Sequence, residues 1–358
     1  MTPGMDLLLQ GPRGRRLCLE VAMQLDPGVR TAAFWSAYEL ESGRGTSRVL
    51  LTAYSSGELA TPPSSAPRPE ELAARLGSLN FAGLDNELIQ AALERSVDTA
   101  RYWQEPDGED VLAGLPVITA ALTPVAERLM SAPGIQWYWQ PRRVEQWAID
   151  WRSADDPAPL PKNPRQTLAE WGRKERAEEE RAARELPRDP RANVSGTWWS
   201  IPHGLVHTIG QVPAALSLVE DSLGWEHAAT VPVRGAGRTL EIGIANDWIS
   251  LCRNFPLDVT ASRRHDWFRV TGRHGRWIIP DWEQVASEWD AVHLTVLGYL
   301  NGATRALQVD TQTATVIAGW DPDSTIWLTD VASEWDGPWQ TWHRASHGDR
   351  WTPVPHWP

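Results

Sequence analysis

The sequence predicts an α+β fold divided into two domains. A length of 358 residues exceeds what one ordinary core needs and suits two domains of about 100–200 residues each. β-prone runs and helical periodicities follow one another without the regular strand–helix alternation of a parallel sheet. A highly charged segment separates the two halves. We expect an N-terminal α+β domain over 1–162, a charged helical linker over 163–192 and a C-terminal α+β domain over 193–358.

Strands are expected near both ends of the first domain. Apolar, β-prone runs at 15–22, 32–40 and 48–54 are bounded by Pro-Gly and Gly-Arg-Gly turns, so they predict a small sheet. Residues 135–139 and 144–149 alternate polar and apolar side chains, as the two strands of a hairpin do.

Helices are expected between these strands. Asp85 or Asn86 can cap a helix whose apolar residues repeat at helical spacing up to Ala100. Pro116 and Pro124 occupy positions typical of a first helical turn, so two shorter helices are expected to begin there.

The linker is predicted to be a helix that can exist in water. Residues 163–190 hold 7 basic and 7 acidic side chains. Thr167 and Glu170 form a capping-box pattern, and Glu180 lies one turn before Arg184. The segment has no continuous apolar stripe, as is typical of a solvent-bridging connector. A surface helix folded against one domain is the alternative.

The second domain is predicted to be a small, split, mostly antiparallel sheet with short helices inserted. Its apolar runs are short and are separated by capping residues and glycine turns. The expected strands are 197–201, 227–233, 239–245, 291–297, 313–320 and 324–329, and the expected helices are 213–223 and those that begin after Asn246 or Asp247 and after Asp281.

The composition disfavours several classes of protein. The net charge is −12, and neither half has the basic excess that binding to a nucleic-acid backbone requires. No apolar stretch could span a membrane, and no basic segment precedes the short apolar run at 7–9, so we expect a cytoplasmic protein. Lys162 and Lys174 are the only lysines, and they lie in or beside the linker. A P-loop, a kinase ATP site and a pyridoxal-phosphate Schiff base are therefore not expected.

Tryptophan and histidine are concentrated in the second domain, which holds 15 of 22 tryptophans and all 9 histidines. A tryptophan ring can stack on a nicotinamide, an adenine or a sugar, although most tryptophans are expected in the cores. His203 and His207 have the H-x3-H spacing of some zinc sites, and His343 and His347 repeat it. The first pair lies in a predicted loop without a third ligand, so no metal site is expected.

Two groups of charged residues are candidates for a site. Arg263 and Arg264 lie in a predicted loop, where two guanidiniums could hold a pyrophosphate or a carboxylate. Simple exposed loop residues are the alternative. Asp321 and Asp323 precede a β-prone run, and two acids one residue apart on an extended segment point to the same side. Such a pair can stabilise a developing sugar cation, whereas an ordinary Asp-Pro-Asp-Ser turn is the alternative.

The second domain resembles the ADP-ribosyltransferase family. Members of that family have a small split sheet that holds NAD, with an acidic pair just before a late strand. The resemblance extends over 194–330. The residues that carry it are Trp199, Ser200 and His203 at the expected first strand, residues 240–248 and 288–293, and the acidic pair Asp321 and Asp323.

This resemblance implies an enzyme that takes NAD as its substrate and cleaves the bond between nicotinamide and ribose. The implied roles are cation stabilisation by Asp323 or Asp321, ribose orientation by His203, nicotinamide stacking by Trp199, cofactor binding by Ser200, and neutralisation of the pyrophosphate by Arg263 or Arg264. Two alternatives remain open. One is a non-enzymatic protein that binds a protein partner through a tryptophan-rich surface. The other is a carbohydrate-binding or carbohydrate-active protein.

Overall fold

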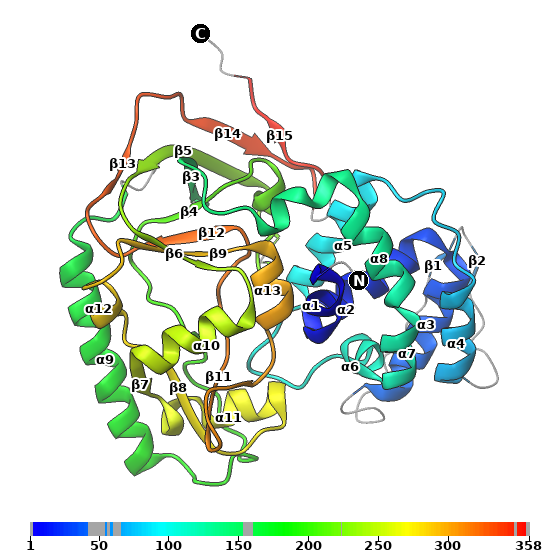
Figure 1. Cartoon of the computed structure of the whole chain (residues 1–358), viewed down its shortest axis with the longest axis horizontal. Helices are drawn as coiled ribbons and strands as arrows, with labels where there is room; N and C mark the ends of the chain where they lie inside the picture. Colours follow the sequence, from blue (N-terminus) through cyan, green and yellow to red (C-terminus); the bar gives the residue numbers. More distant parts are fainter. Residues whose placement is uncertain are drawn as a thin grey trace.

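The protein has an α+β fold, described here from a computed structural model. The structure describes residues 3–41, 54–55, 58–59, 66–152, 160–222, 224–346 and 349–355. Helices make up most of the N-terminal part, and two sheets lie in the C-terminal part (Figure 1). Within these residues, every helix is too short or too polar to cross a membrane.

The N-terminal part is a group of short helices. They are α1 (Pro3–Gln10), α2 (Pro12–Leu25), α3 (Pro27–Leu40), α4 (Pro69–Gly77), α5 (Asn86–Asp98), α6 (Gly108–Gly114), α7 (Pro116–Ala121), α8 (Thr123–Ser131) and the 3-10 helix η1 (Pro133–Trp139), with the short strands β1 (Tyr54–Ser55) and β2 (Glu58–Leu59). Helix α2 lies at the centre and contacts α1, α3, α5, α6 and α8. Residues 16–23 of α2 are all buried, so this helix is enclosed on every side.

The predicted sheet at the start of the chain is wrong. Residues 15–22 lie in α2 and residues 32–40 lie in α3, whereas 48–53 fall outside the described residues. The Asp26-Pro27-Gly28 segment begins a helix instead of forming a turn between strands. Asp26 accepts hydrogen bonds from the amides of Gly28 (2.6 Å) and Val29 (3.1 Å), and Pro27 occupies the first turn of α3.

The other helix predictions in this part are confirmed. Asp85 caps α5 by accepting a hydrogen bond from the amide of Leu88 (2.9 Å), and α7 and α8 begin at or beside Pro116 and Pro124. The hairpin prediction is half wrong, because residues 133–139 form η1 and only the second predicted strand is present.

The large sheet has nine strands in the order β15-β14-β5-β3-β4-β12-β9-β6, with β13 paired to β5. They are β3 (Glu145–Asp150), β4 (His207–Ile209), β5 (His227–Gly235), β6 (Thr239–Ile242), β9 (Ala291–Leu294), β12 (Ser324–Trp327), β13 (Ala332–Glu334), β14 (Gln340–His343) and β15 (Thr352–Pro353). Only the β6–β9 pair is parallel. Strands β5, β6, β9 and β12 were expected from the sequence.

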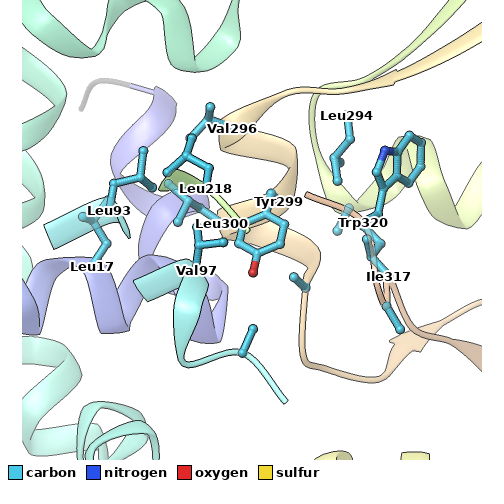
Figure 2. Packing of buried hydrophobic residues seen from close by; sticks show 14 of the residues in the cluster. Leu17, Leu93, Val97, Leu218, Leu294, Val296, Tyr299, Leu300, Ile317 and Trp320 are labelled. Carbon is cyan, nitrogen blue, oxygen red and sulfur yellow. The ribbon is translucent and has the colours of Figure 1, made fainter. Parts of the chain in front are cut away.

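The structure does not confirm a division at residue 162. Strand β3 precedes that position, yet it lies inside the large sheet between β5 and β4, with Trp147 opposite Ile209. One apolar core joins the two parts of the chain. Figure 2 shows Leu17 and Val97 of the N-terminal helices beside Val296 and Leu300 of α13 (Val296–Gly302).

A second sheet has the order β10-β11-β8-β7. The remaining elements are α9 (Pro164–Glu185), η2 (Ala214–Ser217), α10 (Ala245–Asn254), β7 (Pro256–Asp258), α11 (Thr260–Thr271), β8 (Arg276–Pro280), α12 (Trp282–Val285), β10 (Leu307–Gln308) and β11 (Thr313–Thr315). The expected helix over 213–223 is only the short η2, whereas the helices after Ile244 and Asp281 are present.

The expected first strand of the second domain, 197–201, is absent. The rings of Trp198 and Trp199 stack on each other with centroids 4.3 Å apart, and Trp198 also stacks on Tyr102. Successive side chains of a strand point to opposite faces, so two adjacent rings cannot stack in a strand. Aromatic packing therefore determines the local conformation.

Helix α9 is a surface helix that packs against α11 and α12. It buries Leu168 and Trp171. The carboxylate of Glu179 accepts hydrogen bonds from the amides of Ala261 (2.7 Å) and Ser262 (2.8 Å), at the beginning of α11. The structure thus shows the second of the two arrangements considered for the linker.

Candidate functional site

The predicted Trp199–His203 segment is an aromatic cluster. The two rings meet edge to face, with centroids 4.9 Å apart. Ser200 is buried, and its hydroxyl donates to the carbonyl of Ala318 (3.0 Å) and accepts from the amide of the same residue (2.9 Å). A Cβ on Gly319 would lie 2.0 Å from the Trp199 ring. These side chains are therefore used in packing against residues 318–319.

Arg263 and Arg264 lie on α11 and not in a loop. Arg263 is fully buried, and its Nη2 atom lies 2.6 Å from the carboxylate of Glu175 on α9. Arg264 donates to the carbonyl of Pro187 (3.5 Å). The charge of Arg263 is thus balanced within the protein, so the structure does not present this residue as an open pyrophosphate site.

Asp321 and Asp323 do not point to the same side, which corrects the prediction. Asp323 has a φ of 55°, so the backbone is left-handed and not extended at this position. Asp321 accepts a hydrogen bond from the amide of Glu220 (3.1 Å), whereas Asp323 lies 3.5 Å from Nε2 of His293. The two carboxylates belong to different environments.

Asp323 belongs to a buried acid–histidine–acid group. Nδ1 of His293 lies 2.6 Å from a carboxylate oxygen of Glu241 on the neighbouring strand. Burial opposes the charge of His293, but Asp323 and Glu241 raise its pKa above the ordinary value. The imidazole has no exposure, and the side chain of Asp323 is only 11% exposed.

This group continues a polar row across one face of the large sheet. Thr325 is the cross-strand neighbour of His293, and Thr208 is the neighbour of Thr325. Gln146 bridges the two threonines, because it donates to Thr325 (3.0 Å) and accepts from Thr208 (2.6 Å). The amide and hydroxyl part of the row is satisfied by its own hydrogen bonds and holds strands together, whereas Nε2 of His293 and one oxygen of Asp323 are enclosed without a hydrogen-bond partner.

An arginine-rich cavity of about 440 Å³ lies where the N-terminal helices meet the C-terminal part. We call it the arginine pocket, because Arg13, Arg15, Arg101 and Arg305 line it. The rest of its wall consists of Pro12, Thr99, Gln104, Glu105, Pro106, Asp107, Asp110, Val111, Gly114, Leu115, Val270, Thr271, Thr304 and Ala306.

The end of α1 brings two of these arginines together. Arg15 donates from Nη1 to the carbonyls of Leu9 (2.9 Å) and Gln10 (3.1 Å), and Arg305 donates from Nη1 to the same Gln10 carbonyl (3.1 Å). The last carbonyls of a helix have no partners within the helix, so such donors stabilise its end. The helix end thus fixes two guanidiniums from distant parts of the chain at one point.

Arg15 and Arg305 retain one edge of the guanidinium without a partner. Within the described residues, neither forms an ion pair with a carboxylate, and their hydrogen bonds use Nη1 alone. The Nε atoms of both are enclosed and have no partner. Burial lowers the pKa of Arg305, and the charge of Arg15 lowers it further. Because the Nε atoms are enclosed, Nη2 is the nitrogen of each guanidinium that remains for an anion in the cavity.

The ion pairs of Asp107 and Asp110 in the wall are with Arg13 and Arg16. Asp110 acts on Arg15 only through its charge, which opposes the lowering of the Arg15 pKa by burial. Thr304 also lies in the wall, and its hydroxyl is enclosed without a hydrogen-bond partner. The backbone of this residue is left-handed, with a φ of 60°. A left-handed threonine is strained, which is typical of residues held at functional sites.

Sequence reasoning missed this pocket. Residues 15–22 were interpreted as a strand, which placed Arg15 in a sheet. Pro12 at the start of a helix, followed closely by Arg13, Arg15 and Arg16, was the available signal. No local pattern relates Arg305 to this segment, because the two meet only through the contact of α13 with α1 and α2.

A larger cavity, of about 760 Å³, is lined mainly by residues of α2, α3 and α5, among them both acids and arginines. Glu20 in its wall pairs with Arg95 (3.0 Å) and with Arg16 (2.9 Å). Acids and arginines thus occur together in this wall, so its volume alone points to no ligand.

Comparisons of the chain with protein-family models, with curated proteins and with solved structures found no match. Among the described residues, no three histidine, cysteine, aspartate or glutamate side chains are grouped so that they could hold a metal ion. We therefore infer the function from the geometry of the chain itself.

Proposed function

We propose that this protein binds a small anionic metabolite in the arginine pocket. The observation that carries the proposal is that Arg15 and Arg305, on the wall of one cavity, have only backbone carbonyls as hydrogen-bond partners within the described residues. A carboxylate or phosphate group of a ligand in the cavity would supply the counter-charge that these two arginines lack and would relieve the repulsion between the two cations.

The rest of the wall indicates what else such a ligand contains. A volume of about 440 Å³ lies in the range of small-molecule sites. Val111, Leu115, Val270 and Ala306 are apolar and suit an uncharged ligand body. The expected ligand thus has one anionic group, held by the arginines, and a largely apolar remainder.

Isothermal titration calorimetry with sulfate, phosphate and citrate tests the proposal. We expect saturable binding to the wild-type protein and at least a tenfold loss in the double variant Arg15→Gln/Arg305→Gln, since each charged arginine contact is replaced by a neutral amide. Arg184→Gln is the matched control, because Arg184 is an exposed residue of α9. Equal binding by the wild type and the double variant would refute the proposal.

ADP-ribosyl transfer remains a prediction from the sequence resemblance. Asp321 accepts a hydrogen bond from the amide of Glu220, whereas Asp323 lies beside the imidazole of His293. Trp199 packs on residues 318–319. These positions do not form one wall around a dinucleotide, so they do not support that reaction as the arginine pocket supports anion binding. Chromatographic assay of nicotinamide release from NAD, with Asp323→Ala as the variant, tests it directly.

The tryptophan-rich surface is not supported as a binding site. Among the described tryptophans, only Trp139 is more than about a third exposed, at 42%. The largest fully buried side chains include Trp248, Trp267, Trp277 and Trp282. Tryptophan in this chain mainly fills the core.

A further inference from the structure

A buried carboxyl group, that of Glu220, lies behind the arginine pocket. Its Oε1 atom accepts hydrogen bonds from the hydroxyls of Tyr102 and Tyr299, the latter at 2.9 Å. Its Oε2 atom is enclosed and has no partner. Both hydroxyl donors thus act on one oxygen, and within the described residues no hydrogen-bond donor reaches the other.

The second carboxyl group of the pair is that of Asp321. It accepts a hydrogen bond from the backbone amide of Glu220 at 3.1 Å, so the two acids are held together. Burial and the neighbouring Asp321 raise the pKa of Glu220 to about 8, and burial raises the pKa of Asp321 to about 6. At neutral pH, Glu220 therefore carries a proton.

Arg13 connects this carboxyl pair with the arginine pocket. Its positive charge lowers the pKa of Glu220, Tyr102 and Tyr299 against the effect of burial, and its side chain also lines the pocket. On its other side Arg13 is paired with Asp110 of α6. The positive charge of Arg16, on the same helix, repels that of Arg13.

The neighbouring residues provide a second connection. Asp221, which follows Glu220, forms an ion pair of 3.0 Å with the pocket residue Arg101. Arg101 in turn precedes Tyr102, whose hydroxyl donates to Glu220. The charged groups around Glu220 therefore come from α2, α6, α13, the segment after α5 and the loop before β12.

We propose that Glu220 and Asp321 form a proton-binding site that is coupled to the arginine pocket, so that an anion and a proton bind together. This inference rests on the proposed function. The positive charge of Arg13 stabilises both an anion in the pocket and an ionised Glu220. The two negative charges also repel each other, so each makes the other less favourable. Anion binding above neutral pH is thus accompanied by net proton uptake at Glu220, and deprotonation of Glu220 weakens the anion complex.

Sulfate is the probe for the test, because it stays fully ionised throughout the range used. Calorimetric titrations at pH 6.5 and 9.5 are expected to show affinity lower by about tenfold at the higher pH, within the usual range of coupling between two sites. At pH 8, titrations in buffers of different ionisation enthalpy are expected to show net proton uptake. Unchanged affinity with no proton uptake would overturn the coupling and leave the proposed function intact.

Glu220→Gln is the decisive variant, since the amide imitates the neutral acid. It is expected to bind sulfate with the wild-type affinity of pH 6.5, with no dependence on pH and no proton uptake. Glu180→Gln on the exposed side of α9 is the matched control and should keep the wild-type profile. A Glu220→Gln protein that retains the wild-type pH profile would overturn the assignment of the proton to this residue.

Tyr299→Phe provides a second variant if Glu220→Gln does not fold. The hydroxyl of Tyr299 stabilises the ionised form of Glu220, so its loss is expected to move the midpoint of the pH profile upward. A midpoint that does not move would overturn the inference. Absence of sulfate binding at every pH would instead overturn the proposed function itself.

Discussion

Two regions of this molecule place arginines in buried surroundings with opposite results. At the contact of α9 with α11, Arg263 is enclosed and lies 2.6 Å from the carboxylate of Glu175. At the arginine pocket, Arg15 and Arg305 lie near each other and have only backbone carbonyls of α1 as partners. The first region pairs its cation with a carboxylate of the chain, whereas the described residues give the two arginines of the second region no carboxylate partner.

The difference shows why burial or sequence proximity alone does not identify a binding arginine. Arg263 and Arg264 are adjacent in the sequence and looked like an anion clamp, but α9 supplies the balancing carboxylate from 88 positions away. Arg15 and Arg305 are far apart in the sequence and form the unbalanced pair. What matters is whether the chain itself provides the counter-charge.

The largest expected effect comes from breaking the balanced region. Arg263→Ala leaves the carboxylate of Glu175 with its main partner removed, and loss of one member of a buried pair costs about 3–5 kcal/mol. Urea unfolding followed by tryptophan fluorescence measures the change in the free energy of unfolding.

Arg264→Ala is the matched control for this comparison, because Arg264 forms only a hydrogen bond of 3.5 Å to a backbone carbonyl. It should cost less than about 1 kcal/mol, as is usual for a surface substitution. Equal losses in the two variants would mean that the pairing with Glu175 does not distinguish Arg263 from its neighbour.

A smaller effect is expected when the unbalanced region is given the carboxylate that it lacks. Thr304 has an enclosed hydroxyl in the pocket wall and a left-handed backbone, which aspartate and asparagine tolerate better than threonine. Thr304→Asp should reduce sulfate affinity by at least tenfold and should raise the free energy of unfolding by about 1 kcal/mol through its pairing with the guanidiniums.

Thr304→Asn separates charge from shape in this experiment. Asparagine has the same size as aspartate and no charge, so sulfate affinity should stay within about threefold of the wild type, a difference of less than 1 kcal/mol. If both variants lose binding equally, the effect comes from the shape of the wall, and the argument from unbalanced charge is wrong.

The same contrast explains how far the sequence could predict this structure. Local signals were sufficient for α5, with its Asp85 cap, and for strands such as β5, β9 and β12. They failed at α2 and α3, where apolar residues suited a strand as well as a helix and the Asp26-Pro27-Gly28 segment was interpreted as a turn. Tertiary contacts decided the outcome there.

The site was less predictable than the fold, because its parts depend on long-range contacts. The side chains of Asp321 and Asp323 point to different sides because the backbone of Asp323 is left-handed, and no sequence pattern indicates that conformation. The arginine pocket requires α13 to pack on α1 and α2, which brings residues 15 and 305 together. Residue types along the chain suggested possible chemistry, but only the packing showed which charges remain unbalanced.

The smallest expected effect concerns the stability of the pocket without a ligand. Arg15→Gln removes two hydrogen bonds to carbonyls of α1 but also relieves the repulsion with Arg305, so the free energy of unfolding should change by less than about 1 kcal/mol. Sulfate at ten times its dissociation constant should stabilise the wild type by about 1.4 kcal/mol and the variant much less. Thermal unfolding with and without sulfate measures both quantities. A variant that is severely destabilised without sulfate would mean that Arg15 is already balanced within the fold, as Arg263 is, and the distinction between the two regions would no longer hold.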